Sequence, residues 1–145
     1  MTHINLSRIE KEIRSSIRAS ETSELDDITA IYIFGSTLSG QVTESSDIDL
    51  AFLLSYDAYK AEPVHSIQLP YLIAAKVGMR FNMETDVIIL NSASLEIAHG
   101  IVTTGKCIYE NNPDSRLTYE VSLKGMYFDF KPFLDELRLA CISEI

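Results

Sequence analysis

The segment from Asp47 to Leu54, which reads DIDLAFLL, constrains the fold of this chain more than any other. It alternates between acidic and apolar residues at its start and then becomes wholly apolar, a pattern that predicts a strand buried on both faces over most of its length. We interpret it as a central strand of a sheet. Its two acids are costly to remove from water unless something positive compensates them, so they are also the first candidates for function.

Two more short runs have the apolar, β-rich composition of buried strands. Residues 30–34 (AIYIF) are halted by a Gly-Ser pair, and residues 86–90 (DVIIL) begin with a third acid. A brief further strand is predicted at residues 107–109. Because segments with helical patterning separate these runs, we expect a sheet that is covered by helices.

The clearest helical pattern is at the N-terminus, where apolar residues recur every three or four positions from Leu6 to Ile17. This spacing places them on one stripe of an amphipathic helix, which we predict over residues 5–19. The other predicted helices lie at residues 71–80, at residues 94–104 and over residues 115–145, the last broken around Phe130 to Pro132.

The length of 145 residues fits one domain, which can bury roughly two thirds of its unfolded surface. We therefore expect a single domain over residues 1–145. The predicted class is α+β: a small mixed β-sheet with helices packed on one face and a helical C-terminal tail at about residues 113–145.

Charge narrows the choice of partners. The chain has 12 Lys and Arg against 21 Asp and Glu, a formal charge of -9, and no basic stretch dense enough to follow a phosphate backbone. Long nucleic acid is therefore an unfavourable partner. A single nucleotide is still compatible, because a divalent cation can bridge clustered carboxylates and a polyphosphate. No segment approaches the length of a membrane span and no apolar leader is evident, so the expected compartment is the cytoplasm.

The residues with the clearest chemical meaning are Gly35 and Ser36, followed after ten residues by Asp47, Ile48 and Asp49. Successive side chains of a strand point to opposite faces, so the two aspartates emerge together and can share hard divalent cations. The glycine permits a sharp turn and lets backbone amides approach an anion, and the serine offers a hydroxyl. This spacing predicts a place for phosphate beside a metal site.

The third acid, Asp86, begins its own strand. If that strand lies beside the central one, its carboxylate can project toward the first pair, and two cations held there can stabilise both the attacking and the leaving oxygen of an in-line displacement. The alternative is that the acids form an ordinary solvated strand entry. The spacing argues against this, since its chance occurrence in a chain of this length is on the order of 10⁻³.

The Gly-Ser pair, the ten-residue interval, the Asp-x-Asp pair and the later strand aspartate resemble the DNA polymerase β-like nucleotidyltransferase superfamily, in particular its minimal branch. The resemblance implies the nucleotidyltransferase fold, with a catalytic core at about residues 30–90. It implies that Asp47, Asp49 and Asp86 hold Mg²⁺, two ions in such enzymes, with Asp86 also activating the incoming hydroxyl. Gly35 and Ser36 would contact the phosphates of ATP, the substrate.

In its small size the chain resembles the antitoxins of this branch. These are paired with HEPN ribonuclease toxins and transfer AMP from ATP to a toxin tyrosine. The chain is too short for a large acceptor domain and too acidic for tRNA, so a protein hydroxyl is a reasonable acceptor. Two alternatives remain. An acidic cleft would also suit an aminoglycoside, and an antitoxin could act by occlusion without catalysis, since residues 37–40 (TLSG) lack the Arg that relatives often carry there.

Overall fold

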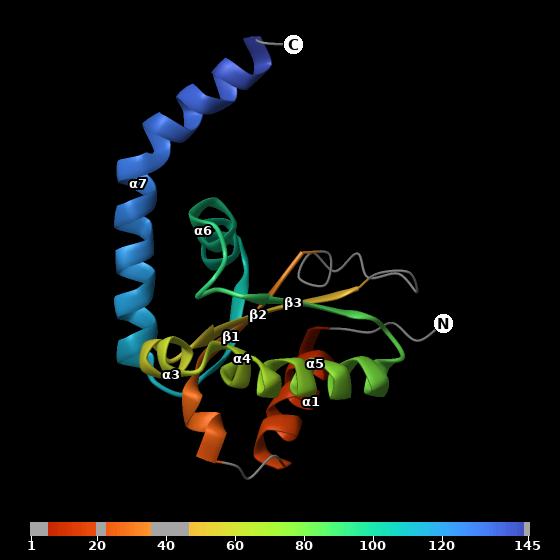
Figure 1. Cartoon of the computed structure of the whole chain (residues 1–145). Helices are drawn as coiled ribbons and strands as arrows, with labels where there is room; N and C mark the ends of the chain where they lie inside the picture. The colour runs from red at the N-terminus through yellow and green to blue at the C-terminus, as the bar shows by residue number, and fades with distance from the viewer. Residues whose placement is uncertain (1–5, 20–22, 36–46, 144–145) are drawn as a thin grey trace.

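A four-stranded mixed sheet forms the centre of the computed structural model, which describes residues 6–19, 23–35 and 47–143 (Figure 1). The strand order is β3-β2-β1-β4, with β1 antiparallel to β2 and β4 and with β2 parallel to β3. The α+β class, the mixed sheet and the interior position of β2 are as predicted. The strands are β1 (Ile28–Phe34), β2 (Ile48–Leu54), β3 (Thr85–Ile89) and β4 (Lys106–Glu110).

One face of the sheet is covered by α1 (Leu6–Ala19) and α5 (Gln68–Phe81). The apolar stripe of α1 is fully buried at Ile9 and Ile13, and packs with Ile73 of α5 against the sheet. This face carries the larger core.

The opposite face is covered by α6 (Leu95–Thr104) and the first half of α7 (Pro113–Ser143) (Figure 1). Leu123 of α7 is buried there against a second cluster in which the strands contribute small side chains, including Ala30 and Ala51. Helices therefore cover both faces of the sheet and not only one face as predicted, because the small strand side chains on this side also leave an apolar surface for α6 and α7. The predicted C-terminal tail is part of this second layer.

Short helices connect the main elements. A 3₁₀ turn, η1 (Ser23–Asp27), precedes β1, and α3 (Tyr56–Ala61) and α4 (Pro63–Ser66) lie between β2 and α5. The helix predicted from residue 71 starts earlier, because Pro70 lies in the first turn, where a missing backbone N–H costs no helical hydrogen bond. The η1 turn is not evident from the sequence.

The break predicted around Phe130 to Pro132 is wrong. Helix α7 continues for 31 residues through Pro132. A proline inside a helix removes one hydrogen bond to the carbonyl four residues earlier, which commonly bends a helix without ending it. Figure 1 shows α7 changing direction along its length. Neither α7 nor any other helix among the described residues has an apolar run suited to crossing a lipid bilayer.

A buried polar network joins α7 to β1. The Tyr32 hydroxyl, on a side chain that is 1% exposed, donates to Oε1 of Glu120 at 2.5 Å and accepts from Nε of Arg116 at 3.2 Å. Arg116 also pairs with Glu120 at 3.1 Å and with Glu110 of β4 at 2.8 Å. Burial and the Glu120 carboxylate raise the pKa of Tyr32, so the phenol stays protonated and keeps donating. The network fixes α7 to the sheet.

We expect Tyr32→Phe to lower the free energy of unfolding by about 1–3 kcal/mol, because it leaves the buried ends of Arg116 and Glu120 with one partner fewer. Thermal and urea unfolding measure this. The control is Tyr56→Phe, since the Tyr56 side chain is 70% exposed and its replacement should change nothing. Equal stability of the Tyr32 variant and the parent chain would mean that the network does not hold α7.

Candidate active site

The first two acids lie at the start of β2. Ile48 and Leu50 are both fully buried on the face covered by α1 and α5. The alternation of a strand therefore directs Asp47 and Asp49 to the opposite face, the one that α6 and α7 cover further along. Both side chains are partly exposed, so a solute can reach them.

The third acid is brought beside them by the parallel pairing of β2 with β3. Asp49 is the register partner of Asp86, and Ile48 is the partner of Thr85. The structure thus brings Asp86, which is distant in the chain, together with Asp47 and Asp49 at one end of the sheet. The sequence could suggest this only on the assumption that the two strands are neighbours.

The backbone of Gly35 lies close to this cluster. It follows β1, has a φ of +74°, and lies next to Phe34, the register partner of Asp49. A Cβ placed on Gly35 would overlap Oδ2 of Asp49 and lie 3.1 Å from its Cγ. Only glycine fits both the left-handed conformation and this contact. Ser36, the other predicted phosphate contact, lies outside the described residues.

The electrostatics of the cluster centre on Asp49. Burial, the charges of Asp86 and Asp47, and a side-chain hydrogen bond with Asp86 raise the pKa of Asp49 to about 6. Two carboxyl groups can share a hydrogen bond only if one of them keeps its proton. Each cause opposes ionisation of Asp49, and the two neighbouring aspartates do so by repulsion between like charges.

The chemistry of these side chains suits a divalent cation, since carboxylate oxygens are the ligands that Mg²⁺ prefers and its charge would reduce the repulsion. Within residues 6–19, 23–35 and 47–143, no three His, Cys, Asp or Glu side chains already converge on one metal position. Binding a cation would therefore require some rotation of Asp47, Asp49 or Asp86, which their partial exposure allows.

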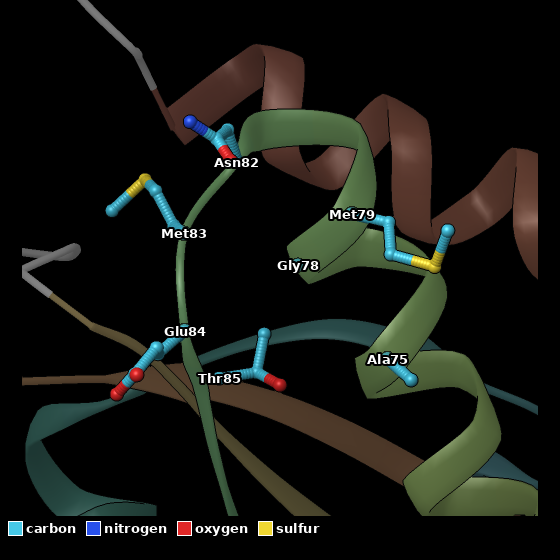
Figure 2. Close-up of a pocket in the computed structure, with 7 residues that line it drawn as sticks. All are labelled: Ala75, Gly78, Met79, Asn82, Met83, Glu84 and Thr85. Atoms are coloured by element: carbon cyan, nitrogen blue, oxygen red, sulfur yellow. The ribbon is translucent and has the colours of Figure 1, made fainter.

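A fourth acid, Glu84, was not identified from the sequence. Its carbonyl accepts a hydrogen bond from the amide of Ile48 at 2.9 Å, which places it beside the start of β2. Figure 2 shows Thr85 directed toward α5 and Glu84 directed to the opposite side of the strand. The Glu-x-Asp spacing of Glu84 and Asp86 repeats that of Asp47 and Asp49, and was the available signal.

A cavity of about 510 Å³ lies between the end of α5 and the segment that leads into β3 (Figure 2). It is open, and it is lined by Ala75, Gly78, Met79, Asn82, Met83, Glu84 and Thr85. Asp47, Asp49 and Asp86 are not among these lining residues. We do not assign the cavity to the site.

Most of the chain matches the model of a known protein family. Residues 18–114 match the family model described as polymerase beta, nucleotidyltransferase, which includes all three aspartates and Gly35. The chain belongs to this nucleotidyltransferase family.

Within the family, the chain is homologous to the MntA antitoxins. It is 28% identical over 127 residues to the protein adenylyltransferase MntA of Shewanella oneidensis, which covers 88% of this chain and 80% of that protein. A solved toxin-antitoxin structure with AMP-PNP is 26% identical, with a TM-score of 0.62 over 93% of this chain and 96% of the other. A tri-AMPylated Shewanella oneidensis HEPN toxin in complex with its MNT antitoxin is similar at 25% identity, with a TM-score of 0.58 over 95% and 96%.

We expect Gly35→Ala to reduce nucleotidyl transfer by about 100-fold, because the new Cβ must displace the Asp49 carboxylate. The left-handed backbone adds a cost of about 1–2 kcal/mol to folding. The control is Gly100→Ala in α6, where a Cβ meets nothing within 4 Å and should leave transfer intact. Parent-like transfer by a folded Gly35 variant would contradict the close contact with Asp49.

A second prediction concerns pH and stability without metal. The pKa of Asp49 is raised from an ordinary 3.8 to about 6 on folding, so ionisation opposes folding and stability falls as pH rises through this window. In EDTA at pH 7.5, Asp49→Asn should raise Tm by roughly 2–5 °C, a modest value because the group is partly exposed. The gain should vanish below about pH 4.

Asp135→Asn makes the same change of charge at an exposed position of α7 and should leave Tm unaltered. A lower Tm for the Asp49 variant at pH 7.5 would show that the aspartates do not repel one another in the folded protein.

Proposed function

We propose that this chain is a magnesium-dependent protein adenylyltransferase that transfers AMP from ATP to a tyrosine hydroxyl of a partner HEPN ribonuclease toxin, and so acts as its antitoxin. The observation that supports it most is the clustering of Asp47, Asp49 and Asp86 beside Gly35, with the raised pKa of Asp49. The family membership supports the nucleotidyl chemistry, and the MntA relatives support the protein acceptor.

In the proposed reaction, the tyrosine oxygen attacks the α-phosphorus of ATP, a new O–P bond forms, and the bond to the bridging oxygen of pyrophosphate breaks. Asp86 accepts the proton of the hydroxyl, and the backbone at Gly35 approaches the phosphates. Mg²⁺ held by Asp47, Asp49 and Asp86 supplies, when bound, the positive charge that offsets the triphosphate and the leaving pyrophosphate.

The site's surroundings support an acceptor that approaches from solvent. Asp47 and Asp49 are half-buried and Asp86 is exposed at the end of the sheet. A formal charge of -9 gives long-range attraction to a basic protein and repulsion of nucleic acid. A protein tyrosine is thus better suited to this site than the terminus of an RNA.

We expect Asp47→Asn and Asp49→Asn each to lower AMP transfer by about 10²–10³-fold, since each removes a charge needed where charge develops. The assay incubates the chain with labelled ATP, Mg²⁺ and a purified HEPN ribonuclease toxin, and locates the label by mass spectrometry of the toxin. Asp135→Asn is the charge-matched control. Removal of Mg²⁺ by EDTA should abolish transfer by the parent chain.

Transfer that persists in both Asn variants would end this proposal. If the Asp47→Asn, Asp49→Asn double variant still neutralises the toxin in the absence of ATP, the chain acts by occlusion instead.

A further inference from the structure

The second half of α7 exposes an unusual number of large apolar side chains. Between residues 126 and 142, seven of them are between 47% and 68% exposed. Figure 1 shows this part of the helix extending past α6 and away from the sheet. These side chains are Met126, Phe128, Phe130, Phe133, Leu137, Leu139 and Ile142.

The patch is large for a surface that stays in water. Phe130 and Phe133 are both more than half exposed, so these two rings alone offer roughly 200 Å² of apolar area, with the exposed parts of Met126 and Leu137 in addition. The largest apolar patch on a typical monomer is about 300–600 Å², and such patches are often functional. A helix that projects from the body is also marginally stable unless its apolar side is covered.

The spacing of the patch indicates the shape of what covers it. Met126, Phe130, Phe133 and Leu137 are separated by four, three and four residues. This is the a/d spacing of a coiled coil, which forms a seam that accepts a second α-helix. We name these four residues the α7 seam.

The charged residues beside the α7 seam indicate what kind of helix can cover it. Asp129 and Glu136, both exposed, precede the two a-type residues of the seam, Phe130 and Leu137, and so occupy the flanking g positions. A second copy of α7 would oppose them with the same acids or with the uncharged Tyr127 and Leu134 of the e positions, and two chains of charge -9 repel. A partner helix with Lys or Arg beside its apolar stripe complements them.

The seam lies on the catalytic side of the molecule. Helices α6 and α7 lie on one side of the sheet, opposite α1 and α5 (Figure 1). Asp49 and Asp86 emerge on that same side, since they alternate with residues that are buried against α1 and α5. A protein bound along α7 is therefore held on the side from which the aspartates are reached.

We infer that the α7 seam docks an amphipathic α-helix of the protein acceptor, with basic residues flanking its apolar stripe, and so brings the acceptor hydroxyl to the aspartates. The inference rests on the proposed function. It assigns binding of the acceptor to α7 and leaves the chemistry to the three aspartates at the other end of the sheet face.

The test measures binding of the purified HEPN protein in the absence of ATP, by calorimetry. Phe130→Glu and Phe133→Glu should each weaken the Kd by at least about tenfold, because each puts a charge into a buried apolar seam. Glu136→Lys should weaken it by about two- to fivefold through lost charge pairing. Phe133→Leu and Ser122→Glu are matched controls that should bind within about twofold of the parent chain.

All the changed side chains except Ser122 and Glu136 are large exposed apolar groups, and none is in the core, so the variants should fold, which circular dichroism and Tm verify. In the transfer assay, Phe133→Glu should raise KM for the toxin and leave kcat at saturating toxin within about twofold. A structural defect at the aspartates would instead lower kcat.

Three results would overturn the inference: no binding of the toxin by the parent chain, parent-like affinity in both Phe→Glu variants, or sedimentation showing that these substitutions dissociate a homodimer. Binding by the parent chain without AMP transfer would refute the proposed function and leave the docking surface standing. If Asp49→Asn loses transfer while the seam variants change neither the affinity for the toxin nor KM, the docking inference is refuted and the proposed function stands.

Discussion

The pairing of Asp49 with Asp86 across two parallel strands is the interaction on which the rest of the site depends. It places two carboxyl groups in hydrogen-bond contact, with Asp47 close enough to add its charge. Folding brings these like charges together and partly removes Asp49 from water, and both effects oppose its ionisation. The fold maintains this unfavourable contact with the large apolar core beneath, where Ile48 and Leu50 are anchored on either side of Asp49.

Repulsion between neighbouring carboxylates is common at sites that bind cations. A chain that only needed a stable sheet would place uncharged residues at these positions. Gly35 serves the same site, because its lack of a Cβ leaves room for the Asp49 carboxylate where any side chain would clash, and its positive φ also favours glycine. The turn and the strand pairing are therefore shaped around one group of oxygens, and the family match covers this whole region.

The features that depend on neighbouring residues in the chain can be predicted from the sequence. Alternation around Ile48 determines where Asp47 and Asp49 point, and an apolar stripe determines the face of α1. The position of Asp86 beside them depends on a non-local parallel pairing, which the sequence only makes plausible. Glu84 was missed for the same reason, since its proximity arises from the backbone contact with Ile48. Pro132 was misjudged because a long helix can bend around a single lost hydrogen bond.

In the function proposed here, the aspartates at one end of the sheet carry out the transfer. The separate α7 seam binds the protein that is modified. The most direct test of the central claim is a crystal structure of the chain with Mn²⁺, as an anomalous substitute for Mg²⁺, and a non-hydrolysable ATP analogue. We predict an anomalous peak bridging the oxygens of Asp47, Asp49 and Asp86 to the triphosphate, with the phosphates beside Gly35. A nucleotide bound elsewhere, or a metal that does not contact Asp49, would contradict the account.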